Sequence, residues 1–406
     1  MATIAILGTF DTKGDEHAYV DQLVRARGHQ TIRVDVGTLE PARLKPDITR
    51  EEIAQAAGVD LASVVSRRDR GEAVALMARG APIILARLHA EGRIHGVLSL
   101  GGGGGTAICT SAMRALPLGI PKFMVSTLAS GNTAPYVGIK DITLMPSIVD
   151  VAGLNRLSRL LLAQAAGAIC GMVEARVPDI QNARPMIVAS QFGNTTPCVS
   201  RARFVLEAAG YEVLVFAATG TGGRTMESII ESGLVAGVLD ITTTEWADEL
   251  VGGVLTAGPT RCEAAALHGI PAILTPGCLD MVNFGEPASV PEKFGNRRFY
   301  HHNPQVTLMR TNPEENTRLG GILAEKCNRS IGPVAVVFPL GGISVISAPG
   351  QPFHDPVADA ALRVSWRSQL RPGIPFIEYP GNINDPAFAD LCVAQLLELI
   401  PSAKPS

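Results

Sequence analysis

The stretch Gly96-Val97-Leu98-Ser99-Leu100-Gly101-Gly102-Gly103-Gly104-Gly105-Thr106 joins an apolar run to five consecutive glycines, and a helical pattern follows over 107–116. A short apolar run that ends in glycines before a helix is typical of a buried strand of a parallel sheet. Residues without Cβ let an anion approach the chain closely, and the free N–H groups and dipole of a helix N-terminus favour it. We therefore predict an anion-binding loop. The alternative is glycine that serves only close packing of strand and helix.

The plan of the first half of the chain recurs in the second half. Each copy shows a strand, a helical segment with identical spacing from Phe10 to Gly28 and from Phe192 to Gly210, and a second strand, followed further on by a strand that ends in a polar corner. The recurring pairs are 4–10 with 186–192, 31–36 with 212–217, 91–98 with 232–239, and the tripeptide Gly-Ile-Pro at 119–121 with 269–271. Because strands that alternate with helices form parallel sheets covered on both faces, we predict an α/β fold of two Rossmann-like lobes related by internal duplication.

The length of 406 residues exceeds the usual limit of a single core and agrees with two domains. We expect an N-terminal nucleotide-binding lobe over 1–180 and a C-terminal lobe over 181–406, with the boundary near 178–185. The segment 334–400, which carries two further strands and two helices, is assigned to the second lobe; an exchanged element that packs on the first lobe is the alternative.

Composition narrows the class of protein. A formal charge of −3 argues against a general binder of nucleic acid or membrane surfaces. Seven cysteines without a Cys-x-x-Cys pair fit reduced, buried thiols in a cytoplasmic protein. The N-terminus lacks the pattern of a signal peptide. The apolar stretch 157–173 is short for a membrane span and is predicted to be a buried or interface helix.

In an open parallel sheet the ligand lies at the carboxyl ends of the strands, which selects three loops of the first lobe. The candidate ligand-binding residues are Thr9, Asp11, Thr12 and Lys13 in the first loop, Gly101, Gly102, Gly103, Gly104, Gly105 and Thr106 in the second, and Ser126, Ser130, Gly131 and Asn132 in the third. Hydroxyls, amides and glycines suit phosphate, ribose or carboxylate groups. An ordinary turn is the alternative for the third loop.

Two charged residues of the first loop have specific expected roles. Lys13 offers a flexible positive charge to a phosphate that is held mainly by backbone amides. Asp11 is an oxygen ligand that suits Mg²⁺ or a ribose hydroxyl. A turn or helix-capping role for Asp11 is equally open.

The second lobe differs at the corner that corresponds to the glycines, where the sequence reads Thr242-Thr243-Thr244-Glu245. Since β-branched residues resist positive φ and block close approach to the backbone, this lobe is not expected to bind a phosphate in the same way. The charged residues of this lobe have two possible roles. They contact a small polar substrate or the other lobe, or they are solvated or paired charges. They are Asp240, Glu245, Asp248, Asp280, Arg224 and Arg261.

The histidines give weaker signals. His301 and His302 are adjacent on an extended segment and point to opposite sides, so the pair is a poor metal site, although one of them could serve as an acid or base. The loop 340–344 is a fourth polar candidate, and His354 with Asp355 is expected to cap the next helix.

Several long motifs taken together resemble one known family. The segments 8–16, 99–106, 126–132 and 339–344 are similar to the ATP-binding domain family named after the tomato mosaic virus resistance protein, and the likeness covers essentially the whole chain. The resemblance implies ATP accompanied by Mg²⁺, two Rossmann-like lobes and a homodimer. It implies no antiviral activity for this chain.

These observations lead to two competing functions. In the first, the protein is an enzyme that uses ATP and Mg²⁺ for phosphoryl or nucleotidyl transfer, with a small acid or sugar acid in the cleft that faces the second lobe; no catalytic residue can be assigned. Phosphoryl transfer needs positioned charge more than a covalent nucleophile, which agrees with the lack of a Ser-His-Asp or Cys-His signature. In the second, it is a nucleotide-regulated protein-binding module without turnover.

Overall fold

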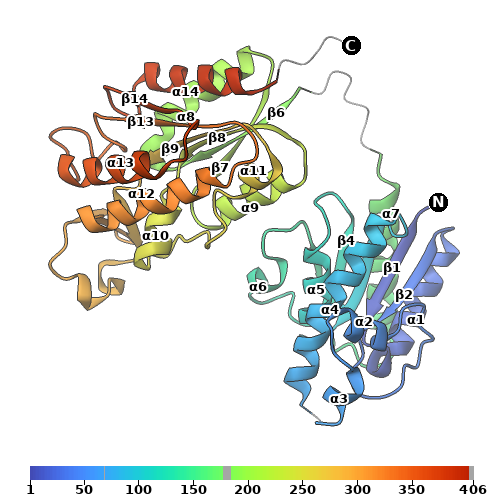
Figure 1. Ribbon diagram of the computed structural model, residues 1–406. Helices are drawn as coiled ribbons and strands as arrows, with labels where there is room; N and C mark the ends of the chain where they lie inside the picture. The colour runs from blue at the N-terminus through green and yellow to red at the C-terminus, as the bar shows by residue number, and fades with distance from the viewer. Residues whose placement is uncertain (68, 177–183, 402–406) are drawn as a thin grey trace. The chain divides into compact units, whose positions relative to one another are not determined.

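The computed structural model describes residues 1–67, 69–176 and 184–401. The chain divides into two compact units, Met1–Asp179 (unit 1) and Ile180–Ser406 (unit 2), and each is described by itself. Figure 1 shows each as a sheet covered by helices on both faces. The predicted boundary, 178–185, lies largely outside the described residues.

Unit 1 is built on a five-stranded sheet in the order β2-β1-β3-β4-β5, and all neighbouring strands are parallel. Its strands are β1 (Thr3–Gly8), β2 (Gln30–Asp35), β3 (Gly96–Gly101), β4 (Lys122–Ser126) and β5 (Thr143–Pro146). The chain winds in one direction from β1 to β2 and in the other from β3 to β5. The strand order therefore reverses between β1 and β3, which is where ligands bind in folds of this kind.

The helices of unit 1 cover both faces of that sheet. They are α1 (Phe10–Ala26), α2 (Arg50–Ala56), α3 (Leu61–Val65), α4 (Arg70–Ala90), α5 (Gly103–Arg114), α6 (Ala134–Val137) and α7 (Arg156–Glu174). Side chains of a strand alternate between faces, so Ile4 and Ile6 join the core cluster under α1 and α7, whereas Ala5 and Leu7 join the cluster under α2, α4 and α5. Every one of these four side chains is fully buried.

Unit 2 repeats the topology of unit 1. Its main sheet has the order β14-β13-β9-β8-β6-β7, again with parallel neighbours only. The strands are β6 (Met186–Gln191), β7 (Glu212–Ala217), β8 (Val235–Thr242), β9 (Ala272–Gly277), β13 (Val334–Pro339) and β14 (Phe376–Tyr379). Taken from β7 to β13, the five strands follow the same order as in unit 1. The predicted Rossmann-like α/β fold is confirmed, and β13 and β14 extend the sheet of unit 2, as assigned.

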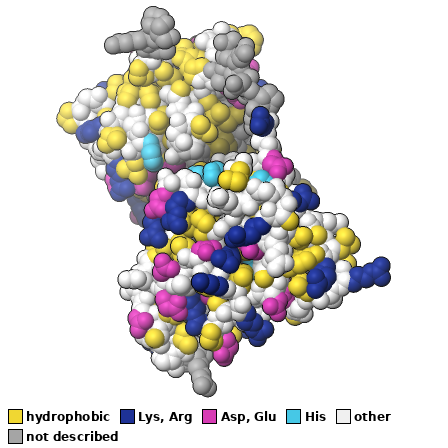
Figure 2. Space-filling view, turned by 90° about the vertical axis from the view of Figure 1, so that its right-hand side faces the viewer, with side chains coloured by type: hydrophobic (Ala, Val, Ile, Leu, Met, Phe, Trp, Pro, Cys, Tyr) yellow, Lys and Arg dark blue, Asp and Glu magenta, His cyan; other side chains and the backbone are white. Residues whose placement is uncertain are grey.

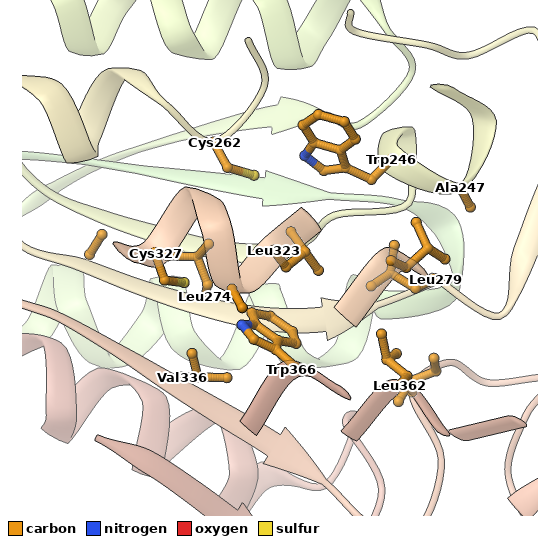
Figure 3. Packing of buried hydrophobic residues seen from close by; sticks show 14 of the residues in the cluster. Trp246, Ala247, Cys262, Leu274, Leu279, Leu323, Cys327, Val336, Leu362 and Trp366 are labelled. Carbon is orange, nitrogen blue, oxygen red and sulfur yellow. The ribbon is translucent and has the colours of Figure 1, made fainter. Parts of the chain in front are cut away.

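Helices cover both faces of this sheet as well. They are α8 (Thr196–Ala208), α9 (Thr221–Glu231), α10 (Glu245–Val251), α11 (Ala264–His268), α12 (Pro313–Asn328), α13 (Pro356–Gln369) and α14 (Pro386–Leu399). One core cluster joins α8 and α14 to the sheet. The other gathers Trp246, Cys262, Cys327 and Trp366 around Leu274, and Figure 3 shows these side chains between the strands and the helices. All seven cysteines of the chain are free and buried, as predicted.

One element of unit 2 was not anticipated. Three antiparallel strands, β10 (Met281–Phe284), β11 (Phe299–Asn303) and β12 (Val306–Arg310), form a separate small sheet in the order β10-β12-β11. His301 and His302 lie on β11, and both are exposed. Strands this short carry too little periodic pattern to be separated from a loop by sequence.

Two helices, α4 and α7, are long and apolar enough to cross a membrane by length and composition, and 44% and 33% of their most apolar windows are buried. Helix α7 buries one face, including Leu162, Ala165 and Ile169, in the core that it shares with α1. Core helices of water-soluble proteins pass the same test of length and composition. On the face that Figure 2 shows, Lys and Arg side chains are interspersed with Asp and Glu.

Candidate functional site

A pocket of about 320 Å³ lies in unit 1 where the strand order reverses between β1 and β3. Residues that follow all five strands contribute to it, together with the start of α4. The lining residues are Thr9, Asp11, Thr12, Lys13, Thr38, Leu39, Arg70, Val74, Gly102, Gly103, Gly104, Gly105, Ile108, Thr127 and Asp150. We call this the switch-point pocket.

The glycine run is the first turn of a helix rather than a loop that precedes one. Helix α5 begins at Gly103, four residues earlier than expected, and its N-cap Gly102 has no side chain to cap it. The amide of Thr106 bonds to the carbonyl of Gly102 over 2.8 Å, whereas the amides of Gly103, Gly104 and Gly105 have no acceptor among the described residues. Three unsatisfied N–H groups and the positive end of the helix dipole therefore meet at the switch-point pocket.

The space around each glycine distinguishes two reasons for having glycine there, close packing within the protein and close approach of a ligand. A Cβ on Gly101 would lie 3.1 Å from the backbone of Gly105 and Thr106, so tight packing explains this glycine. A Cβ on Gly102, Gly103 or Gly105 would meet no protein atom closer than 3.8 Å, and none of them has positive φ. A Cβ on Gly104 would make ordinary contact, 3.5 Å, with Val74. The protein itself gives no steric reason for glycine at these four positions.

Two cations line the switch-point pocket, and only one was predicted. Lys13 sits at a kink in α1, where its backbone leaves the helical region, and its ammonium donates a hydrogen bond to the carbonyl of Val151. Arg70 is the first residue of α4, and its guanidinium has no ion-pair partner among the described residues. A Cβ on Gly104 would lie 3.9 Å from Arg70 Nη2, which puts this guanidinium beside the glycine turn.

Asp11 organises the turn that follows β2. Its Oδ1 accepts the amide of Thr12 over 2.7 Å, and its Oδ2 accepts the amides of Thr38 and Leu39 over 3.0 and 2.8 Å. The sequence allowed Asp11 either to form a turn or to bind a metal ion. The structure shows that Asp11 forms the turn. The carboxylate still lines the pocket, with about one lone-pair site left.

The candidate residues from the sequence fall into two sets. Eight of them line the switch-point pocket, namely Thr9, Asp11, Thr12, Lys13, Gly102, Gly103, Gly104 and Gly105. Six do not. Gly101 ends β3, and Thr106 and Ser126 are buried behind the turn, where their hydroxyls hydrogen bond over 2.7 Å. Ser130, Gly131 and Asn132 are exposed in the loop after β4 and do not reach the pocket.

Sequence reasoning missed seven lining residues, Thr38, Leu39, Arg70, Val74, Ile108, Thr127 and Asp150. Thr38, Thr127 and Asp150 follow strand ends, so the strand-end rule contained a signal for them. Asp150 is exposed and has no hydrogen-bond or ion-pair partner among the described residues. Arg70 and Val74 come from α4 and could be brought to the site only by the packing of α4 on α5.

His17 is buried directly beneath the end of β1. Its Nδ1 lies 2.6 Å from the carbonyl of Lys13, and its Nε2 lies 1.9 Å from where a Cβ of Gly8 would stand. Burial lowers the pKa of His17 to about 4, so the ring is neutral at pH 7. Gly8 and His17 thus pack as a fixed pair behind the kink at Lys13.

The corresponding corner of unit 2 is filled by protein charges. The fully buried Arg261 donates from Nε to Glu245 over 2.6 Å, through both terminal nitrogens to Asp240 over 2.6 and 2.7 Å, and to Glu227 over 3.0 Å. The Glu245 carboxylate in turn accepts the amides of Gly220 and Gly223 at the N-terminus of α9. These charges are paired with one another, which agrees with the prediction of solvated or paired charges. They are buried, however, and not solvated.

The other charged residues of unit 2 that sequence singled out have structural partners. Asp248 accepts the backbone and side-chain amides of Asn283 over 2.6 and 2.7 Å, and burial raises its pKa to about 7. Asp280 accepts the hydroxyl of Ser344 over 2.8 Å, and burial raises its pKa to about 6. The exposed Arg224 donates to the carbonyl of Thr256 and to its own helix.

No group of three or more His, Cys, Asp and Glu side chains that could hold a metal ion occurs within residues 1–67, 69–176 and 184–401. Two carboxylates, Asp11 and Asp150, line the switch-point pocket. Mg²⁺ needs few protein carboxylates when phosphate oxygens and waters complete its octahedron. The donor set therefore fits a magnesium ion that arrives with a phosphate ligand.

Comparison with known proteins defines the family. Residues 2–178 match the N-terminal domain of the uncharacterised protein family UPF0261, and residues 184–400 match its C-terminal domain. A UPF0261 protein of Clostridium tetani is 48% identical over 398 residues, 98% of each chain. The tomato ToMV resistance protein Tm-1(GCR237) is 42% identical over 344 residues, which are 82% of this chain and 45% of the tomato protein.

Solved structures add little to this assignment. The esterase domain of a Rhodothermus marinus protein aligns with 54% of this chain and 87% of its own, at 13% identity and a TM-score of 0.28. Sequence identity confirms that this chain resembles the resistance protein and its relatives. The family descriptions assign no activity to them.

Proposed function

Since the chain belongs to the UPF0261 family, we propose that it is an ATP-binding protein whose unit 1 holds the phosphates of MgATP in the switch-point pocket. The observation that carries this proposal is the set of four glycines, Gly102 to Gly105, that have neither positive φ nor a close protein neighbour. Glycine disfavours a helix relative to alanine, so three glycines in one helical turn are a cost that a ligand in van der Waals contact with the backbone would explain.

Charge at the switch-point pocket supports a polyphosphate over a neutral ligand. The uncapped amides of Gly103 to Gly105 suit one phosphate group. Lys13 and Arg70 supply two positive charges beside them. Asp11 and Asp150 supply the carboxylates that a magnesium ion between phosphates would use; when bound, the ion would neutralise charge on the phosphate oxygens. Asp150, which has no partner among the described residues, is the better placed of the two for this role.

The activity that we propose is ATP-dependent phosphoryl or nucleotidyl transfer to a small acid or sugar acid. The pocket provides positioned donors and cations, which is what phosphoryl transfer requires of a protein. The residues of unit 1 would hold and orient the triphosphate, and the acid would supply the nucleophilic oxygen. We further propose a cytoplasmic location, in agreement with seven free thiols, and the homodimer implied by the family resemblance, which light scattering in solution tests.

Titration calorimetry with MgATP tests the binding. The wild type is expected to bind one MgATP per chain, and Gly103→Ala to weaken binding at least tenfold, because its methyl group would intrude between the phosphate and the amides. Gly171→Ala is the matched control, since Gly171 is a helical glycine on α7 with open space around it and does not line the pocket. Equal affinities of wild type and Gly103→Ala would refute phosphate binding at this turn.

Product analysis then separates an enzyme from a nucleotide-regulated binding module. Release of ADP, for phosphoryl transfer, or of pyrophosphate, for nucleotidyl transfer, with any small carboxylic acid supports transfer. Binding of MgATP without turnover across a panel of acids, together with a change in oligomeric state on nucleotide addition, supports the module.

A further inference from the structure

We propose that unit 2 holds its own binding site for a small hydroxy acid, in a pocket at the end of β13 between the turn 339–342 and helix α13. The proposal deepens the proposed function, and it rests on that function only for the role of the acid as the second substrate. The sequence led us to expect the acid in a cleft that faces the second lobe. We now propose that the acid binds at a site formed entirely within unit 2.

The pocket has a volume of about 260 Å³ and lies at the carboxyl end of a strand of the main sheet, where ligands of α/β proteins bind. Its polar side chains are His354, Asp359 and Arg363, and all three come from α13 or the segment just before it. Drug-sized ligands occupy about 300 Å³ or more, so this pocket suits a smaller metabolite.

Arg363 is the anion-binding group of this pocket. Its Nη1 lies 3.3 Å from Glu378 Oε1, and the same oxygen accepts Arg367 over 2.9 Å. Two guanidinium groups thus share one carboxylate, which leaves a net positive charge on this wall. The remaining N–H donors of Arg363 have no acceptor among the described residues, and a guanidinium fork matches a carboxylate in two parallel hydrogen bonds.

Asp359 is held rigidly as a hydrogen-bond acceptor. Its Oδ1 accepts Arg310 Nη2 over 2.5 Å, and Arg310 is itself buried and donates to the carbonyl of Phe353 over 2.8 Å. The second oxygen of Asp359 accepts no hydrogen bond from the described residues, although the residue lines the pocket. This oxygen is available to a hydroxyl group of a ligand.

His354 supplies a second acceptor for a hydroxyl. Its Nδ1 lies 3.3 Å from the carbonyl of Ser347, a contact in which only a protonated Nδ1 can donate. In the neutral ring Nε2 then carries no proton and can accept a hydrogen bond. One cationic fork and two acceptors in one small pocket select a molecule that carries both a carboxylate and a hydroxyl group.

The turn at the pocket mouth is shaped by packing rather than by the ligand. A Cβ on Gly341 would lie 2.7 Å from the backbone of Gly381, and Gly342 has a φ of 116°. The recognition of the acid therefore depends on side chains, in contrast to the backbone amides of the switch-point pocket. This difference makes the two sites separable by mutation.

Saturation-transfer NMR without nucleotide, with L-malate, D-glycerate and D-gluconate as probes, tests the proposal. At least one probe is expected to bind the wild type, and Arg363→Gln to weaken that binding at least tenfold. Arg318→Gln is the matched control, because Arg318 is exposed on α12 and does not line the pocket. Asp359→Asn is expected to weaken binding of the hydroxy acid more than binding of its deoxy analogue.

The outcomes distinguish this site from the nucleotide site. Lack of binding by all three probes, or unchanged binding in Arg363→Gln, overturns the proposal whatever the protein does with ATP. Circular dichroism checks that each variant folds, and retained MgATP affinity in Arg363→Gln shows that unit 1 is intact. Loss of MgATP binding in Gly103→Ala with retained acid binding would support two independent sites.

Discussion

Arg261 and Glu245 form a buried ion pair, with Arg261 Nε 2.6 Å from Glu245 Oε2, at the corner of unit 2 that corresponds to the glycine turn of unit 1. Glu245 also accepts the amides of Gly220 and Gly223, so a protein carboxylate occupies the anion-binding N-terminus of α9. Helix α9 follows β7, the counterpart of β2, whereas the counterpart of α5 is α10, which begins at Glu245 itself. In unit 1 no side chain of the described residues caps the N-terminus of α5. The duplicated framework thus has one corner that is satisfied internally and one that is open.

The first prediction concerns this ion pair. Arg261→Met should destabilise unit 2 by about 3–5 kcal/mol, because Asp240, Glu245 and Glu227 would be left buried without their cation. Both tryptophans of the chain, Trp246 and Trp366, lie in unit 2, so urea unfolding followed by tryptophan fluorescence reports on this unit. Arg224→Met, at an exposed arginine, is the control and should change stability by less than about 0.5 kcal/mol. Similar stabilities for the two variants would contradict a structural role for the cluster.

The second prediction separates the five glycines by stability. Gly101→Ala should destabilise unit 1 by about 1–3 kcal/mol, since its Cβ would press on the backbone of Gly105 and Thr106. Gly103→Ala should leave stability unchanged or raise it by up to about 1 kcal/mol, because alanine favours the helix. Hydrogen exchange of peptides from β1 and β3 measures both effects. A destabilised Gly103→Ala protein would mean that the glycine serves packing.

The third prediction concerns the two cations. Lys13→Met and Arg70→Ala should each weaken MgATP binding by about 10- to 100-fold, the range expected for loss of a hydrogen bond to a charged group. Neither change should affect binding of adenosine, which lacks phosphates. Arg79→Ala, on the exposed side of α4, is the control for a change of net charge. Calorimetry with both ligands provides the measurement, and equal losses for ATP and adenosine would exclude contact with phosphate.

The fourth prediction follows from the low pKa of His17. Its folded pKa of about 4 lies below the ordinary value of 6.5, so the unfolded chain binds the proton more readily. The contribution of His17 to the stability of unit 1 should therefore be complete above pH 6.5 and be lost as pH falls toward 4, with a total loss of about 3 kcal/mol. Hydrogen exchange of β1 at pH 7 and pH 5 in wild type and His17→Asn tests this. An equal pH dependence in the two proteins would show that His17 does not carry the effect.

The fifth prediction has the opposite sign. The pKa of Asp248 is about 7 in the folded protein against an ordinary 3.8, so the folded state binds the proton more tightly. Stability of unit 2 should fall as pH rises from about 4 to about 7, by up to about 4 kcal/mol. Asp248→Asn should remove the part of this slope that Asp248 carries and leave the part carried by Asp280, whose pKa is raised to about 6. Asn283, whose Oδ1 has no partner among the described residues, can rotate its amide to accept the new donor. Fluorescence-detected urea unfolding at pH 5 and pH 8 gives the comparison, and an unchanged slope in the variant would count against the assignment.

Periodic pattern predicted most of the regular structure. The strand 212–217 has the predicted bounds, and the two main sheets are parallel, as strand–helix alternation predicts. The small sheet of β10, β11 and β12 was missed, because its strands are short and none of them alternates between buried and exposed residues. The start of α5 was placed too late, because glycine carries no helix signal of its own.

The sequence by itself determined that two related parallel-sheet units exist and that the polar strand-end loops of the first contain a glycine turn, since these depend on local periodicity and on residues without Cβ. Only the tertiary structure decided which of those residues meet. Packing of α4 on α5 brought Arg70 and Val74 to the switch-point pocket, and the fold of the loop after β4 left Ser130 and Asn132 outside it. Burial determined the role of the charged residues of unit 2. Their carboxylates could have faced solvent, but they are buried around Arg261, where a charge is stable only when it is paired.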